Sequence, residues 1–282
     1  MMGTSYDHYI YAAHMRKWAT ENRVTVLRRG ERKPRLLDIG KAVAAERGLN
    51  APSTEAAYGK VEDLFNRALP RLIDPMSKPT DRDWKALREY AVLVHDRYPV
   101  LRGLAADEHG LSGGNAMMVP NPAHWGSASP ATNPVASLAT SMDREQLKAA
   151  RLQLLPLSAQ YLPPMTQILH VGPMLLGDAG IHAITFHPEP ATARAYVAMP
   201  LTPGAMVAFG DQIISDEEGL NLARILNLKL AMESTVVVDT LEAPVITGMV
   251  AEMWKHQVEP SGAGLPNSLH LWSRIEDVPK PR

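Results

Sequence analysis

The chain contains no cysteine, and this absence removes several kinds of chemistry. Disulfides, thiol nucleophiles and thiolate metal sites are excluded, so any metal ion would need histidine and carboxylate ligands. No apolar run approaches the roughly 20 residues that a membrane-spanning helix requires, and the N-terminus lacks the apolar core of a signal peptide. We therefore expect a soluble, cytoplasmic protein that does not enter a membrane.

A large net charge is also lacking, because 29 basic and 30 acidic residues give a formal charge of -1 at pH 7. Only a local basic patch could therefore attract a polyanion. Proline is abundant, with 23 residues, many of them between Pro120 and Pro203, where long helices are disfavoured. The length predicts one domain, residues 1–282, with a long loop or insertion at 105–140 and a C-terminal extension at 243–282.

Helical periodicity dominates the first half of the chain, and short β-rich runs dominate the second. Apolar residues recur at intervals of three and four over 58–72 and 84–98, which predicts an antiparallel pair of helices. Apolar runs separated by Gly, Pro and Asp predict strands at 167–171, 183–186, 196–199, 206–209 and 236–238. We expect an α+β fold whose helical first half packs on a mixed or antiparallel sheet formed mainly by the second half.

Capping residues and prolines predict where several other helices begin and end. Ser53 is the expected N-cap of the helix over 58–72, and Ser215 or Asp216 caps a later helix. Residues 38–47 favour a short helix, and another helix runs from Asp143 to Pro156.

The opening segment combines a polar and aromatic cluster with a basic hairpin. Residues 6–19 show a partial helical stripe, and strands at 24–27 and 34–37 flank a turn that contains Gly30. Up to Arg35 there are eight basic residues against three acidic ones, a local excess of five. Such a hairpin either faces phosphate groups or is a solvated sheet edge protected by charge, and the residues concerned are Arg28, Arg29, Arg32 and Lys33.

Several short motifs occur in an order that is similar to a known bacterial family. The sequence Asp7-His8-Tyr9-Ile10, followed by a helix and the hairpin, resembles the opening of domain-of-unknown-function family 4238. Further places that agree in order are Ala44–Arg47, Arg97–Pro99, Met199–Pro203, and Ile225–Asn227 followed by Val236-Val237. The resemblance spans roughly residues 5–239. The function of the family is not established, so the resemblance implies a fold more than a reaction.

The chain departs from the family pattern at two places. The first histidine of the family motif is Asp7 here, and the proline that follows the motif's tyrosine and valine is replaced by Tyr11. The family's Thr-Ser-Asp-Asn-Pro turn corresponds to Leu176–Gly180, where only Asp178 is kept. If these motifs build a catalytic site, this chain has a reduced one.

Asp7, His8 and Asp178 form the candidate catalytic set, with Arg97 as a phosphate-binding group. One histidine and two carboxylates suit a divalent metal ion, of unknown identity, that activates water against a phosphodiester. This prediction requires the opening segment to lie beside Asp178. Arg97 could instead cap a helix C-terminus, and Asp178 could belong only to a glycine-flanked turn.

Other polar residues have structural and functional interpretations side by side. Tyr9, like His8, is expected either near the site or as a hydrogen-bonded packing residue, and Asn227 as a buried amide that bonds the sheet. His182 and His187 flank a predicted strand near Glu189, which is a weak pattern for a metal site.

The sequence leaves two classes of function open, and it does not decide whether the chain is an enzyme. The first is a metal-assisted hydrolase that acts on nucleic acid or another phosphate-containing substrate, in phage–host conflict. The second is a non-catalytic module that binds nucleic acid or protein, or a structural subunit of an assembly, including a homo-oligomer. No HExxH or GxxxxGK[ST] motif favours another reaction.

Overall fold

A computed structural model describes residues 7–8, 10–28, 31, 33–39, 45–46, 51–97, 144–160, 162–189, 192–234, 236–241 and 250. Of Asp7, His8 and Arg97 it describes only the backbone. Several predictions fall outside these residues, namely the loop or insertion at 105–140, nearly all of the extension at 243–282, and the sites at Tyr9, Arg29 and Arg32.

The centre of the fold is a four-stranded antiparallel sheet, here called the central sheet, with the strand order β5-β9-β8-β7. Each strand contains one of the apolar runs that predicted it. Their bounds are β5 Met165–His170, β7 His182–Glu189, β8 Thr192–Thr202 and β9 Ala205–Gly210. Pro203 and Gly204 form the tight connection between β8 and β9, a place that favours proline and glycine.

Both faces of the central sheet are buried, and its strands are therefore apolar on both sides. In β9, Val207 and Phe209 belong to one hydrophobic cluster, and Met206 and Ala208 belong to the other. This division follows from the two-residue period of a strand, which sends alternate side chains to opposite faces. The same alternation holds in β8, where Val197 faces one cluster and the neighbouring residues on either side face the other.

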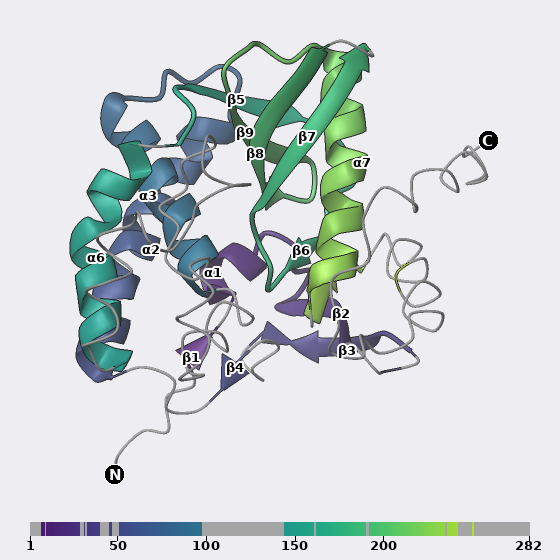
Figure 1. Cartoon of the computed structure of the whole chain (residues 1–282). Coiled ribbons are helices and arrows are strands. Elements are labelled where there is room, and N and C mark those ends of the chain that lie inside the picture. The colour runs from purple at the N-terminus through teal and green to yellow at the C-terminus, as the bar shows by residue number, and fades with distance from the viewer. Residues whose placement is uncertain are drawn as a thin grey trace, which may run out of the picture.

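Helices cover the two faces of the central sheet, as Figure 1 shows. On one face lie α2 (Pro52–Ile73), α3 (Asp81–Arg97) and α6 (Arg144–Gln160), and on the other lies α7 (Asp216–Glu233). The predicted α+β class is confirmed, and the first-half helices do pack on the sheet. The helix α7 adds a third layer, which buries the second face of the sheet.

Two helices begin with reciprocal caps. Ser215, one of the two residues predicted to cap α7, shares a capping box with Glu218. Thr80 caps α3, because its hydroxyl oxygen accepts the backbone N–H of Asp83 at 3.4 Å. In return, the carboxylate of Asp83 accepts the hydroxyl and the backbone N–H of Thr80, and it also accepts the guanidinium of Arg71. Arg71 is the main cause that holds the pKa of Asp83 well below its ordinary range. These caps satisfy backbone N–H groups that have no partner inside a helix.

One predicted cap, one predicted helix end and two predicted helices are wrong. Ser53 is not a cap, because α2 begins at Pro52 with Ala51 as its N-cap. The helix α6 continues through Pro156 to Gln160, with Leu155 and Ala159 buried against the other helices. The predicted short helix at 38–47 is replaced in part by the strand β4, Ala45–Glu46. The stripe over 6–19 yields only a four-residue helix, α1, Ala12–Met15.

The predicted N-terminal hairpin exists, but it belongs to a second sheet. This hairpin sheet has the order β3-β2-β10-β6 and consists of β2 Arg23–Arg28, β3 Arg35–Asp38, β6 Leu176–Gly177 and β10 Val236–Asp239. A further pair joins β1 (Asp7–His8) to β4. The last described strand, β10, thus pairs with β2 from the start of the chain.

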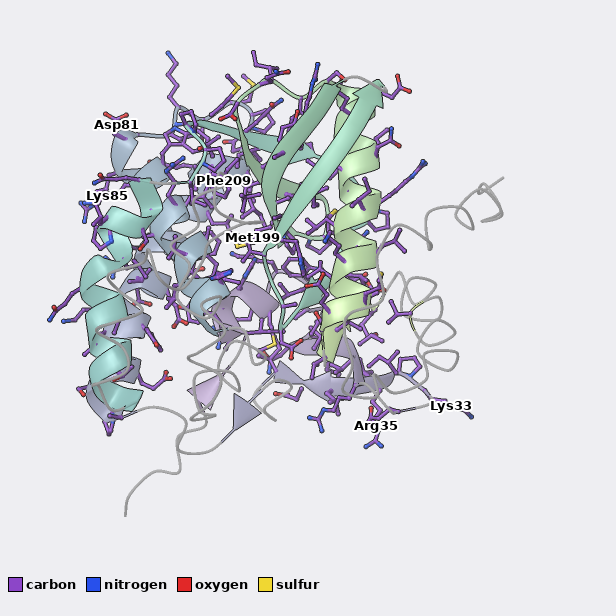
Figure 2. All side chains as sticks on the ribbon, in the orientation of Figure 1. Lys33, Arg35, Asp81, Lys85, Met199 and Phe209 are labelled. Carbon is purple, nitrogen blue, oxygen red and sulfur yellow. The ribbon has the colours of Figure 1, made fainter. Side chains whose placement is uncertain are left out.

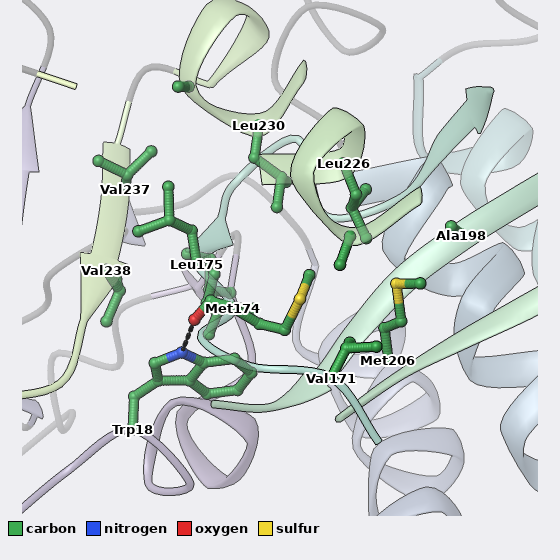
Figure 3. Packing of buried hydrophobic residues seen from close by; sticks show 14 of the residues in the cluster. Trp18, Val171, Met174, Leu175, Ala198, Met206, Leu226, Leu230, Val237 and Val238 are labelled. Carbon is green, nitrogen blue, oxygen red and sulfur yellow. Dashed lines mark hydrogen bonds between the residues drawn. The ribbon is translucent and has the colours of Figure 1, made fainter. Parts of the chain in front are cut away.

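Trp18 anchors the opening segment between the two sheets. Its side chain is 1% exposed, and its indole N–H donates to the carbonyl oxygen of Met174 at 2.8 Å. Figure 3 shows this bond beneath Leu175 and beside Val238, with the side chains of α7 above. A buried indole N–H needs such an acceptor, so the bond fixes the opening segment against the loop that leads into β6.

Candidate functional site

Asp178 lies in a tight turn between β6 and β7, and the glycines on both sides are required by packing. A side chain at Gly177 would collide with Ser234 at the end of α7, and one at Gly180 would collide with Val94 of α3. Gly180 also has a φ of +42°, which favours glycine. The turn is therefore enclosed between α3 and α7.

The carboxylate of Asp178 bonds to the start of β10. It is 2% exposed, and its Oδ1 accepts the backbone N–H of Val236 at 3.2 Å. The backbone N–H of Asp178 donates to the carbonyl of Val236, also at 3.2 Å. This two-way contact ties the turn to the hairpin sheet.

Asp178 lies in a cluster of polar residues that no sequence pattern linked to it. We call this cluster the polar junction, and its members are Asp178, His182, Glu233 and Ser234. The hydroxyl of Ser234 accepts the N–H of Ala179 at 3.3 Å, and Nδ1 of His182 lies 3.4 Å from Glu233. Only the pattern around His182 could have signalled this cluster, because Glu233 and Ser234 end a helix some 50 residues later.

The His182–Glu233 pair has the form in which a carboxylate orients an imidazole. Burial raises the pKa of Glu233, but the hydrogen bond and charge of His182, together with Lys229, outweigh it, so the pKa lies below the ordinary value. The Nε2 atom of His182 is buried, and none of the described residues offers it a hydrogen bond. Ser234 and His182 are 0% and 6% exposed, whereas the side chain of Glu233 is 39% exposed, so the junction connects α7, β7 and β10 and reaches solvent at Glu233.

The opening segment contacts this region through Trp18. Its strand β1 belongs to a different, two-stranded sheet. Asp7 pairs with Glu46 and His8 with Ala45, in the two-stranded sheet. Trp18 bonds to Met174, four residues before Asp178. The opening segment therefore contacts the loop that precedes the Asp178 turn. The side chains of Asp7 and His8 lie outside the described residues.

Arg97 is the last residue of α3, and the same end of α3 contacts the Asp178 turn. Val94, three residues earlier, is the side chain that would meet a substituent on Gly180. The final turn of α3 and the Asp178 turn are thus neighbours. The side chain of Arg97 lies outside the described residues, so its role as a phosphate-binding group stays a prediction.

Asn227 of α7 is half-buried rather than buried, and it bonds to the loop that precedes β6 and not to a strand. Its Oδ1 accepts the N–H of Leu175 at 2.9 Å, and its Nδ2 donates to the carbonyl of Pro173 at 2.8 Å. Both polar ends of one amide are thereby used to hold this loop against α7. Since Trp18 bonds to the same loop, Asn227 helps to position the approach to Asp178.

The basic hairpin lies at an edge of the hairpin sheet. Arg28, Lys33 and Arg35 are exposed, and Figure 2 shows Lys33 and Arg35 at the periphery of the molecule. Arg35 is 65% exposed and forms an ion pair of 3.3 Å with Glu31. The N–H of Glu31 donates to the carbonyl of Arg28 at 2.9 Å, which closes the turn. Among the described residues, no strand pairs with the outer edge of β3.

A small pocket opens near the N-terminus of α7. Its volume is about 70 Å³, and its lining residues are Arg194, Ala195, Tyr196, Asp211 and Gln212. Arg194 donates to Glu218 at 2.7 Å, so its charge is neutralised by the capping box of α7. A pocket of this size has room for a few water molecules.

No family model, curated protein or solved structure matches the chain. The resemblance to family 4238 therefore stays a prediction. Within the described ranges, no three His, Asp or Glu side chains gather in a way that could hold a metal ion. The side chains of His187 and Glu189 lie outside those ranges. The described helices include none that is long and apolar enough to cross a membrane.

Proposed function

We propose that this protein binds nucleic acid, or a comparable phosphate polyanion, through the hairpin β2–β3. The observation that carries the proposal is the exposure of Arg28, Lys33 and Arg35 together at one edge of a nearly neutral chain. Clustered cations displace the counterions that surround a polyanion, and this release drives binding. Arg29 and Arg32 belong to the same hairpin in sequence.

The hairpin is a firm support for these cations. Its strand β2 is paired on both sides, with β3 and with β10, and Val24, Val26 and Leu27 are 0–1% exposed. Arg28 lies at the end of this strand, and Arg35 lies on β3, which pairs with it. Cations on paired strands keep their spacing when a ligand binds, which limits the entropy lost on association. A solvated edge that only prevents sheet-to-sheet pairing would need the charges but no ligand.

The proposal is tested by charge reversal with a charge-matched control. The hairpin variant carries Arg28→Glu, Arg29→Glu, Arg32→Glu and Lys33→Glu. The control carries Lys60→Glu, Arg67→Glu, Lys78→Glu and Arg82→Glu, four exposed cations on or beside α2 and α3. Both variants change the net charge equally, so only a local role separates them. We expect the hairpin variant to lose at least about tenfold in affinity for nucleic acid relative to the control. Equal losses would contradict the proposal.

A metal-assisted hydrolase is the second candidate, favoured by the contact between α3 and the Asp178 turn. The packing of Val94 on Gly180 puts the end of α3, to which Arg97 belongs, beside the turn that contains Asp178. Asp7, His8 and Asp178 would supply one imidazole and two carboxylates, a donor set that suits a hard or borderline divalent ion. Asp178 would have to share its buried carboxylate between that ion and Val236.

Hydrolysis of a chromogenic phosphodiester with added Mg²⁺ or Mn²⁺ tests this candidate. We expect His8→Ala and Arg97→Ala to lower the rate if the site is active, with unfolding curves recorded for each variant to separate loss of fold from loss of chemistry. Asp178→Asn keeps the shape of the buried side chain and removes its charge. Turnover that survives Asp178→Asn unchanged would remove Asp178 from the reaction.

A further inference from the structure

We infer that the partner of the hairpin is a B-form DNA duplex, which it contacts through the phosphate backbone. The alternative is a single strand whose bases stack on the protein. This inference rests on the proposed function and names its ligand. Its first basis is the side chains of the hairpin itself. Residues 21–39 contain no Phe, Trp, Tyr or His. The nearest preceding aromatic residue, Trp18, is 1% exposed and bonded to Met174.

Aromatic residues matter because proteins that bind single strands hold the bases by stacking. Each stacked base contributes about 1–3 kcal/mol, and a basic groove follows the backbone beside the stacking platform. The hairpin has the basic component alone. Its other exposed side chain on β3 is aliphatic, Leu36, which is 48% exposed. A duplex keeps its bases paired and stacked within itself, so it needs only the cations.

The shape of the hairpin supports the same ligand. A two-stranded ribbon fits the major groove of B-form DNA, which is about 12 Å wide. Strand β3 has a free outer edge among the described residues, and Arg28 pairs with Val236, the first residue of β10. Arg28 and Lys33 therefore lie near the turn of the hairpin, where the described pairing of β2 with β10 ends. The major groove of an A-form RNA duplex is deep and narrow, and a ribbon does not enter it.

The number of cations sets the expected dependence on salt. Arg28, Lys33 and Arg35 are exposed, and Glu31 offsets part of the charge of Arg35. With about three phosphate contacts, the slope of log K against log salt concentration is about -2.7 for duplex DNA and about -2.1 for a single strand. Loss of one phosphate-contacting cation lowers the magnitude of the slope by about one.

The experiment measures fluorescence anisotropy of the full chain with three probes of one sequence: a DNA duplex of roughly 16 base pairs, its single strand, and the RNA duplex, from about 25 to about 200 mM salt. We expect the DNA duplex to bind at least about threefold tighter than either of the others, with the steeper slope. The single variants Lys33→Glu and Arg35→Glu should each reduce that slope, whereas Lys60→Glu and Arg67→Glu, at exposed positions of α2, should not.

The outcomes separate this inference from the proposal beneath it. Equal or tighter binding of the single strand or of the RNA duplex overturns the choice of duplex DNA but leaves nucleic-acid binding by the hairpin in place, provided that Lys33→Glu still weakens it. Binding that the hairpin substitutions do not weaken, or no binding to any probe, overturns both.

Discussion

The hydroxyl of Tyr90 on α3 donates a hydrogen bond to Nδ1 of His14 on α1, with 2.9 Å between the two atoms. The direction follows from the other ring nitrogen, because Nε2 lies 3.2 Å from the carbonyl oxygen of Leu201, which can only accept. His14 is 2% exposed, and its ring makes edge contacts with Trp18 and Phe65. One neutral imidazole thus joins the opening segment, the helical layer and β8.

Removing the Tyr90 hydroxyl should leave a buried acceptor without its donor. Tyr90→Phe keeps the ring that stacks on Phe65 at 3.8 Å, but it leaves Nδ1 of His14 unpaired. We expect a loss of about 1–3 kcal/mol in the free energy of unfolding, measured with urea. Tyr11→Phe is the matched control, since its hydroxyl bonds to Asp63 at 3.3 Å in an exposed position and should cost less. Equal losses would show that the His14 bond has no special weight.

Acid should destabilise the fold through His14. Burial is the main cause that lowers its pKa from 6.5 to about 4, so the unfolded chain takes up the proton first. The stability is complete above pH 6.5 and falls as the pH drops toward 4, by about 3 kcal/mol in total for this group. His14→Gln removes this titration, and the other titratable groups are the same in both proteins, so the comparison isolates His14. Urea unfolding between these pH values should show a smaller loss for His14→Gln, and parallel curves would refute the assignment.

The central sheet could be predicted because its strands are continuous apolar runs, and the hairpin because of its charged turn. What joins them could not be predicted. Val26 of β2 pairs with Val238 of β10, more than 200 positions later, and no local pattern encodes that partner. Ala45 and Glu46 have good helix propensity, but their pairing with Asp7 and His8 overrides this weak preference.

The candidate site shows the same limit. Asp178 could be chosen from the sequence only through its place in the family's turn motif, whereas the glycines that flank it predicted a turn and are indeed required by the close approach of Val94 and Ser234. Its polar neighbours His182 and Glu233 come from separate elements that only the packing of α7 brings together. Charge and glycine are local signals, whereas the composition of a buried polar cluster is a long-range one.

Arg88 should be sensitive even to replacement by lysine. Its guanidinium donates to the carbonyl oxygens of Ala159, Leu162 and Pro163, and also to Thr166, so it holds the end of α6 and the start of β5. A lysine ammonium cannot reproduce the planar fork that reaches all of these acceptors. We expect Arg88→Lys to lower the free energy of unfolding by about 2–3 kcal/mol.

The control for Arg88 is the same substitution at an exposed arginine. Arg67→Lys on α2 keeps the charge at a solvent-exposed position and should change the stability by less than about 0.5 kcal/mol. The two variants differ only in the contacts of the guanidinium. A loss at Arg88 no larger than at Arg67 would mean that its hydrogen bonds are replaced by water without cost.

Two glycine-to-alanine substitutions should change the stability in opposite directions. At Gly210, the added methyl carbon would lie 2.5 Å and 2.6 Å from two ring carbons of Tyr196, which is itself 3% exposed and enclosed by the core. Neither the ring nor the strand can move freely, so we expect Gly210→Ala to cost about 1–3 kcal/mol. At Gly59, inside α2, no atom lies within 4 Å of the added carbon, and alanine should stabilise the helix by about 0.5–1 kcal/mol. Thermal unfolding of both variants tests the packing directly, because a stabilised Gly210→Ala protein is incompatible with Tyr196 lying against β9.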